Sequence, residues 1–260
     1  MSLRIILMAI FVVFMLSSCA LAAAILSQFM TADQKPFSLA FDGTYIWNLG
    51  QETGLLYKFD QSGTLLDSIA TDPLFTWATG MDYKADENIL LVLWYPYYVY
   101  NISISDYSTS LRFQFPFSLP YPNGLADDGA GGLWINSCDY DRWTYKVNQD
   151  TGAYLGKFQT LGKLPQGIAT DGTYLYILGF MDGIIYKYDF SGNKIEDSYF
   201  PLPPLFVVGQ ERDYAGGLAY GGGTILYQCC CDTRTIYTID WAYDNSVQPT
   251  SLGYVKALMR

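Results

Sequence analysis

The side chains available for catalysis are limited, because none of the 260 residues is histidine. Histidine is the commonest general base and the commonest metal ligand in proteins. The aspartates that recur in similar surroundings, Asp42, Asp128 and Asp171, each precede a glycine. In such turns an aspartate accepts hydrogen bonds from nearby backbone amides. These aspartates therefore predict structural turns and not a pair of catalytic acids.

A second set of side chains is suited to binding. It combines aromatic rings with two amides and consists of Trp77, Trp94, Tyr121, Asn123, Trp143, Gln166 and Tyr214. Aromatic planes beside hydrogen-bonding groups can bind the faces of sugars or hydrophobic and aromatic peptide side chains. The same rings can also pack between structural elements, so their role depends on where the fold places them.

The two amides of this set are poor candidates for a metal site. Asn123 and Gln166 supply neutral oxygens, and the equivalent positions elsewhere in the chain hold Phe37, Thr79 and Gly216. A hard cation prefers several carboxylates among about six oxygens, and glycoside hydrolysis needs two acids at a set separation. We therefore expect no catalytic residue, no metal ligand and no cofactor, although enzymatic activity stays open as an alternative.

The elements that position these residues are indicated by a repeat. The segment Ile185-Tyr186-Lys187-Tyr188-Asp189 has related copies around Tyr57, Tyr100, Tyr145 and Tyr237. The spacing of roughly 40 to 50 residues is typical of propeller blades. Each copy is preceded by a stretch of small residues, such as Gly167-Ile168-Ala169, which suits an innermost strand where backbones converge.

Composition and repeat together predict an all-β chain. The sequence contains 23 tyrosines and 24 glycines, which favour strands and turns respectively. We predict a single-domain β-propeller over residues 24–260, with five four-stranded blades that start near Lys35, Trp77, Tyr121, Leu164 and Tyr214. Ring closure is expected to use Ala24–Met30 as an outer strand beside Ser251–Leu258.

The repeat resembles that of the NHL and virginiamycin-lyase-like propellers. Their pattern has an inner strand G-I-A-x-D, matched by Gly167 to Asp171, and a later turn Y-x-x-D-x-x-G, matched by Tyr186 to Gly192. The resemblance covers nearly the whole chain from about Phe37. Members often have six or seven blades, so either five close the ring here or one blade has diverged. The lyase chemistry relies on histidine and does not carry over.

The resemblance implies that the binding set lies on one face. In such propellers the loops into the inner strands and the loops between the second and third strands share a face, where ligands bind. The first kind of loop includes Trp77, Tyr121, Asn123, Gln166 and Tyr214, and the second includes Trp94, Tyr95 and Trp143. The sequence therefore favours non-catalytic binding of a carbohydrate, peptide or protein. The alternatives are a lyase-type or lactonase-type enzyme and a structural subunit of a surface assembly.

Residues 1–23 have the layout of an export signal. Met1 to Arg4 carry one positive charge, and an uninterrupted apolar run follows to Leu16. Leu16-Ser17-Ser18-Cys19 resembles the bacterial lipobox, which implies lipidation of Cys19. Cleavage after Ala22 and an uncleaved anchor, which Ile5–Leu26 is almost long enough to form, are alternatives. We expect an exported protein, either tethered to a membrane in the periplasm or at the cell surface, or secreted.

The net charge and the cysteines limit which partners and which disulfide bonds can be expected. The net charge of −10 would repel phosphate backbones, so nucleic acid is not an expected partner. Membrane contact is expected only through the N-terminal segment. An exported domain meets an oxidising compartment, but the sequence leaves the pairing of Cys138, Cys229, Cys230 and Cys231 open.

Overall fold

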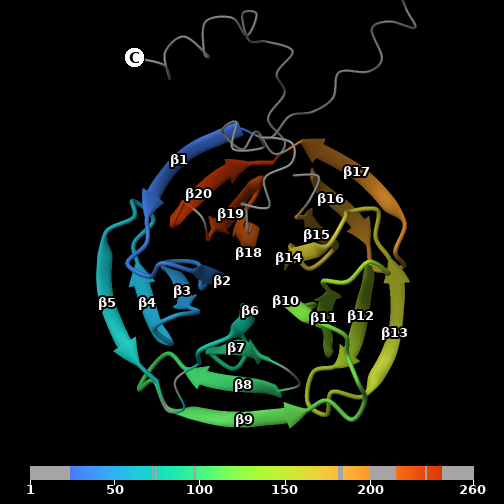
Figure 1. Cartoon of the computed structure of the whole chain (residues 1–260), viewed down its shortest axis with the longest axis horizontal. Helices are drawn as coiled ribbons and strands as arrows, with labels where there is room; N and C mark the ends of the chain where they lie inside the picture. Colours follow the sequence, from blue (N-terminus) through green and yellow to red (C-terminus); the bar gives the residue numbers. More distant parts are fainter. Residues whose placement is uncertain are drawn as a thin grey trace, which may run out of the picture.

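The structure is a computed structural model that describes residues 24–71, 73, 75–95, 98–180, 184–199, 215–231 and 233–241. These residues contain twenty strands and no helix. The strands form five antiparallel four-stranded sheets, which Figure 1 shows arranged as blades around a central axis. The predicted all-β, five-bladed propeller is therefore confirmed.

Each sheet is a simple meander that runs from the axis to the rim. Blade 1 consists of β2 (Pro36–Phe41), β3 (Ile46–Gly50), β4 (Leu55–Phe59) and β5 (Leu65–Ala70). Blade 2 consists of β6 (Ala78–Lys84), β7 (Ile89–Trp94), β8 (Tyr98–Ser103) and β9 (Thr109–Gln114). Blade 3 consists of β10 (Pro122–Asp127), β11 (Gly132–Ser137), β12 (Trp143–Asn148) and β13 (Tyr154–Gln159).

Blade 4 consists of β14 (Pro165–Thr170), β15 (Tyr174–Gly179), β16 (Ile184–Asp189) and β17 (Lys194–Tyr199). Blade 5 consists of β18 (Ala215–Gly222), β19 (Ile225–Cys230), β20 (Thr235–Asp240) and β1 (Ala24–Met30). The innermost strands β2, β6, β10, β14 and β18 each begin one residue after an expected blade start.

The ring is closed by pairing the two ends of the described chain. β1 is the outermost strand of blade 5 and pairs antiparallel with β20, with Ala24 opposite Asp240 and Met30 opposite Thr235. The sequence therefore predicted the closing strand, but its neighbour is β20. The run 251–258 expected beside it lies outside the described residues.

Close approach of the innermost strands explains the glycines of the repeat. A Cβ atom on Gly80 would lie 2.7 Å from the backbone carbon of Gly124 in the next blade, and one on Gly217 would lie 2.6 Å from the backbone nitrogen of Leu39. The second contact joins blade 5 to blade 1. Five blades therefore complete the ring, and no diverged sixth blade is needed.

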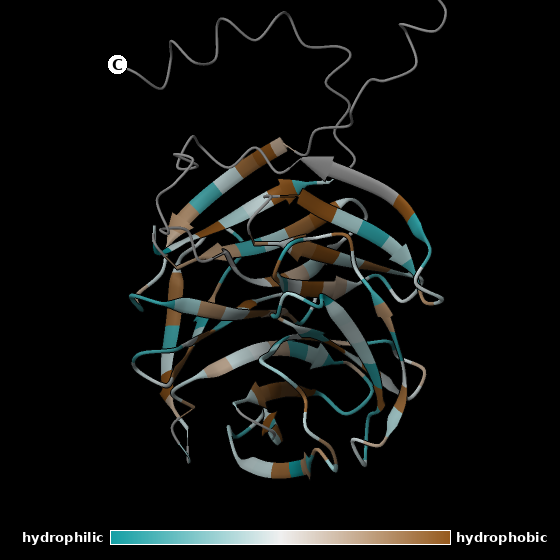
Figure 2. Ribbon diagram, turned by 45° about the vertical axis from the view of Figure 1, so that its right-hand side comes forward, coloured by the Kyte–Doolittle hydropathy of each residue, from teal (hydrophilic) through white to brown (hydrophobic). Residues whose placement is uncertain are grey.

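Five apolar clusters fill the spaces between neighbouring blades. One combines Trp47 and Leu49 of blade 1 with Leu90 and Val92 of blade 2, and the other four join the remaining pairs in the same way. Apolar and polar segments alternate along many strands in Figure 2, as expected for sheets that pack face to face. Burial between blades is thus the main source of stability.

The Asp-Gly turns connect the first and second strands at the face opposite to the loops that lead into the inner strands. The Asp171 carboxylate accepts hydrogen bonds from the backbone N–H groups of Thr173 (2.8 Å) and Tyr174 (2.7 Å), and from the hydroxyl of Tyr176 (2.9 Å). Asp42 binds its own turn in the same manner. These contacts are structural, as the sequence predicted.

The four cysteines of the described chain are free thiols. Cys229 and Cys230 are consecutive in a strand, so their side chains point to opposite sides of blade 5 and belong to different apolar clusters. The Cys231 thiol donates to the carbonyl of Pro36 over 3.3 Å. Cys229 and Cys230 therefore pack as small apolar groups between blades.

Candidate functional site

An open cleft of about 380 Å³ lies on blade 2, lined by Thr76, Trp77, Trp94 and Tyr95. The residues come from the loop that leads into β6 and from the end of β7. Ala78, the first residue of β6, lies opposite Trp94 in the strand pairing. The cleft is therefore built on the innermost hairpin of one blade.

A left-handed backbone conformation presents Trp77 to solvent. Its φ is 69°, and the residues at the same place before β10 and β14, Tyr121 and Leu164, have φ of 41° and 51°. Each carbonyl accepts a hydrogen bond from the residue that follows the second strand of its blade, as Trp77 does from the N–H of Tyr95 at 3.4 Å. The conformation costs roughly 1–2 kcal/mol at a non-glycine residue.

Because this turn recurs in three blades, it belongs to the fold and not to one site. Its functional consequence lies in which side chains it exposes. Trp77 is 64% exposed and Tyr121 is 65% exposed. Large aromatic rings held in solvent by a rigid turn are suited to contact with a ligand.

The floor of the cleft is rigid by contrast. Trp94 packs edge-to-face on the buried Phe75 (ring centroids 6.0 Å apart) and on Tyr100 (5.7 Å). Its indole N–H donates to the carbonyl of Thr76 over 2.6 Å. Trp94 is thus fixed by packing and by a hydrogen bond, while the neighbouring Trp77 is mostly exposed.

The two amides occupy a different place, near the axis. Asn123 and Gln166 are the second residues of β10 and β14 and are 8% and 5% exposed. The Gln166 amide donates to the Cys138 sulfur at 3.8 Å. Burial raises the pKa of this thiol, and hydrogen bonds from Gln166 and Asn123 oppose the rise. The thiol therefore stays neutral at ordinary pH, which makes it a poor nucleophile.

The other predicted site residues are scattered. Trp143 begins β12, where the Lys157 ammonium lies 4.0 Å from the centroid of its ring and one side packs against the core between blades 2 and 3. Tyr121 shares the exposed turn geometry of Trp77 but does not line the cleft. Tyr214 and Cys19 lie outside the described residues. The structure therefore brings together Trp77 and Trp94, and separately Asn123 and Gln166.

Thr76 and Tyr95 line the cleft but were not in the predicted set of site residues. Tyr95 belongs to a loop that the sequence had already assigned to the same face. Thr76 could not have been identified from the sequence, because it holds Trp94 through its backbone carbonyl, which any residue would supply. Its role follows only from the fold of the loop.

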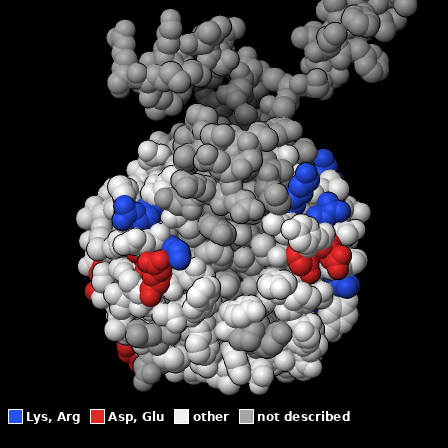
Figure 3. Space-filling model, viewed as in Figure 1, with Lys and Arg blue, Asp and Glu red and all other residues white. Residues whose placement is uncertain are grey.

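Among the described residues, no carboxylate lines the cleft and no group of three or more Cys, Asp or Glu residues is arranged to hold a metal ion. The face turned to the viewer in Figure 3 shows charged side chains only in separate small groups.

The described residues also include no helix long and apolar enough to span a bilayer.

Comparison with known proteins identifies the fold but no family. No family model matches the chain, and no curated protein matches it. Among solved structures, glutaminyl cyclase from Myxococcus xanthus superposes with a TM-score of 0.64 at 13% sequence identity, covering 84% of this chain and 95% of that chain. A streptogramin B lyase superposes with a TM-score of 0.50 at 11% identity, covering 86% of this chain and 99% of that chain.

These likenesses confirm the fold-level resemblance to virginiamycin-lyase-like propellers. At such low identity they show the architecture alone, because one propeller fold carries many unrelated functions. Both solved structures are of enzymes by their names. Function has to be argued from the site of this chain.

Proposed function

We propose that the chain is a non-catalytic binding protein whose blade 2 cleft receives the apolar face of a carbohydrate. The observation that carries the proposal is the pairing of an exposed Trp77 with a fixed Trp94 in one open cleft. The C–H face of a sugar ring can stack on such rings while its hydroxyl groups remain in water. The volume of about 380 Å³ lies in the lower part of the usual range for ligand sites.

Openness favours a sugar over a peptide side chain as ligand. Specificity for an apolar peptide side chain comes from pockets that enclose it and remove it from water. Here Trp77 is 64% exposed and Tyr95 is 45% exposed, so a bound group would stay partly solvated. An aromatic peptide is the second candidate, because the same rings would accept it.

The proposal is tested by titrating the full chain with mono- and oligosaccharides and with short aromatic peptides, followed by tryptophan fluorescence and thermal shift. We expect sugars to bind and Trp77→Ala to weaken binding by about thirtyfold, the loss typical of a central aromatic contact. Leu155→Ala is the matched control, since Leu155 is 54% exposed on the outer strand β13. The control should bind like the parent.

Four results would contradict the proposal. Binding of peptides without sugars would replace the ligand class, and equal binding by Trp77→Ala and the parent would exclude the cleft. Stabilisation by calcium that a chelator reverses would favour the enzyme alternative. Concentration-dependent assembly without any ligand response would favour the structural alternative.

We also propose export with lipidation at Cys19, which rests on the signal-like sequence of residues 1–23. The proposal predicts a mature protein that begins at a lipidated Cys19 and partitions with membranes. Mass spectrometry of the N-terminal peptide measures this directly, and Cys19→Ala should abolish the lipid. A mature N-terminus after Ala22, without lipid, would contradict lipidation but leave export in place.

A further inference from the structure

The innermost hairpin of blade 2 departs from the other four at three linked positions. Asp82 stands where the other inner strands have the buried alanines Ala40, Ala126, Ala169 and Ala219. Its partner in the pairing is Leu91, where the other blades have Trp47, Trp134, Tyr176 and Tyr227. Lys84 takes the place of the turn aspartates Asp42, Asp128 and Asp171.

These three changes replace one kind of interaction by another. In blade 1 the indole N–H of Trp47 donates to the Asp42 carboxylate over 2.8 Å, and in blade 4 Tyr176 and Asp171 form the equivalent pair. Leu91 has no donor and is smaller than either aromatic residue. At the position of the Asp82–Leu91 pair, blade 2 therefore has a carboxyl group and an aliphatic side chain where the other blades have an alanine and an aromatic ring.

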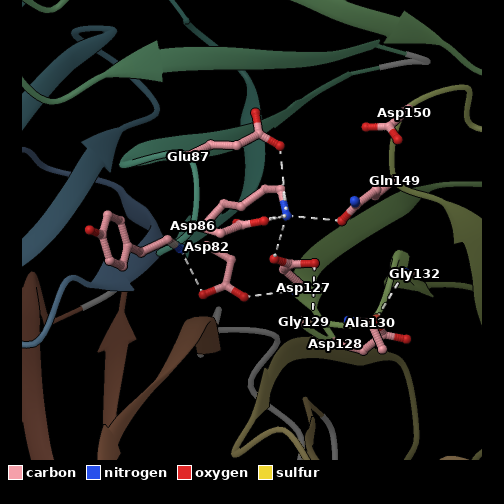
Figure 4. A network of polar contacts seen from close by, with 12 residues as sticks. Asp82, Asp86, Glu87, Asp127, Asp128, Gly129, Ala130, Gly132, Gln149 and Asp150 are labelled. Carbon is pink, nitrogen blue, oxygen red and sulfur yellow. Dashed lines mark hydrogen bonds and ion pairs between the residues drawn. The ribbon is translucent and has the colours of Figure 1, made fainter.

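The Asp82 carboxyl bridges the two blades. One oxygen accepts the backbone N–H of Asp127 at the end of β10 over 2.8 Å, and the other accepts the N–H of Tyr83 over 2.8 Å. Figure 4 shows Asp82 and Asp127 joined in this way. Two residues earlier, the backbones of Gly80 and Gly124 are already in close contact. The carboxyl thus lies at the contact between β6 and β10.

The surrounding charges do not neutralise Asp82. The Lys84 ammonium lies 2.9 Å from Asp86, 3.5 Å from Asp127 and 3.7 Å from Glu87, and it donates to Gln149 over 3.0 Å. Other charges around the contact are already paired: Arg112 with Glu87 and Asp150, and Lys146 with Asp128. Within the described chain no cation lies at ion-pair distance from Asp82.

An acid in this position favours its neutral form. The pKa of Asp82 is raised to about 7. The largest cause is the enclosure of its carboxyl group between the blades, although the residue as a whole is partly exposed; the nearby negative charge of Asp127 adds to the rise, and the two backbone hydrogen bonds act in the opposite direction. Burial also raises the pKa of Asp127, against the effect of Lys84. Asp42 of the neighbouring blade 1 adds a negative charge near Tyr83. The negative charge of Asp127 thus disfavours ionisation of Asp82 at the same contact.

We propose that the contact between β6 and β10 is a proton-dependent joint, tight while Asp82 carries a proton and easier to open once the proton is lost. When the joint opens, the carboxylate becomes fully hydrated and its affinity for the proton falls to that of an ordinary aspartate. Opening therefore releases a proton at any pH at which Asp82 is protonated in the closed form and ionised in the open form.

Linkage sets the sign and the pH window. The open state has an ordinary aspartate pKa of 3.8 and the closed state one of about 7. Opening therefore becomes about tenfold more favourable for each pH unit between roughly pH 4 and pH 7, and it levels off above pH 7. Acid tightens the joint, and neutral conditions loosen it.

Amide hydrogen exchange on the full-length chain at pH 5, 6, 7 and 8 tests the joint, after correction for the pH dependence of intrinsic exchange. Protection of the β6 and β10 amides should fall about tenfold per pH unit from pH 5 to pH 7 and then level off. The amides of β14 and β15, where Ala169 occupies the equivalent position, serve as the internal control and should not change. Asp82→Asn keeps an acceptor oxygen and should remove the dependence.

Asp82→Ala restores the residue of the other blades and provides a second variant if Asp82→Asn folds poorly. Constant protection in the parent would overturn the proposal without any variant. A decline that persists in both variants would also overturn it, as would a decline that Asp127→Asn abolishes, because Asp127 would then be the titrating group. A parallel decline in β14 and β15 would indicate global unfolding instead of a joint.

Discussion

The packing of the innermost strands leads to a sharp prediction for Gly80. Alanine at this position would place a Cβ atom 2.7 Å from the backbone carbon of Gly124 and 2.7 Å from the backbone nitrogen of Leu125. Gly80 has an ordinary extended φ, so no backbone strain adds to the effect. The obstacle is backbone and not a flexible side chain, so β6 and β10 must move apart by nearly 1 Å.

The magnitude follows from two opposing terms. Overpacking of a tight interior costs roughly 1–3 kcal/mol, and in a closed ring the displacement spreads to every blade. Replacing glycine by alanine also restricts the unfolded chain, which stabilises the protein by about 0.4–1 kcal/mol. We therefore expect Gly80→Ala to lower the free energy of unfolding by about 1 kcal/mol.

Gly156 provides the matched control. It lies in the outer strand β13, has an ordinary φ, and a Cβ atom there would have no neighbour within 4 Å. Gly156→Ala should be neutral or stabilise the protein by up to about 1 kcal/mol. Urea unfolding of parent and variants at one pH, with equal slopes required, measures both. If Gly80→Ala were as stable as Gly156→Ala, the close approach of β6 and β10 would be refuted.

Further predictions concern stability. Tyr186 is 6% exposed in the core between blades 3 and 4, so Tyr186→Ala should cost about 3–5 kcal/mol in denaturant unfolding; parent-like melting would show that the assigned repeat is wrong. Asp171→Ala leaves the Tyr174 N–H and the Tyr176 hydroxyl without their acceptor and should cost about 1–3 kcal/mol, part of which Asp171→Asn should recover. Between pH 4 and pH 7 the parent should lose about 4 kcal/mol relative to Asp82→Asn, because the pKa of Asp82 lies at about 7 in place of 3.8 and one pKa unit corresponds to about 1.4 kcal/mol. Equal pH dependence in urea unfolding would contradict this last expectation.

Much of the fold could be predicted because its determinants are local and repeated. The Tyr-Lys strand, the Asp-Gly turn and the small residues of the inner strand recur in several blades, so each copy supports the others. The glycines were expected where backbones converge, and the structure shows the contacts responsible. The sequence predicted 251–258 as the neighbour of β1, whereas the structure pairs β1 with β20. No sequence pattern specifies which strand a closing strand will join.

The candidate site could be predicted only in part. The sequence identified aromatic residues in loops on one face, and two of them, Trp77 and Trp94, do share a cleft. It could not separate them from Trp143, because a ring that packs and a ring that binds look alike in sequence. The positive φ at Trp77 occurs together with a hydrogen bond from the N–H of Tyr95 to its carbonyl, a contact between two loops that the sequence does not reveal.

Asp82 shows where the two kinds of information meet. Alignment of the repeats reveals, without any structure, that Asp82 occupies a position that holds alanine in the other blades. Its proton affinity depends on burial between two blades and on Asp127, which is 45 residues away in the sequence. Local patterns by themselves determined the strands, the turns and the five repeats that could be recognised, because those depend on backbone preferences and on the spacing of apolar residues. Ring closure, the cleft and the neutral acid were decided by the tertiary structure, because each depends on groups that only the complete ring brings together.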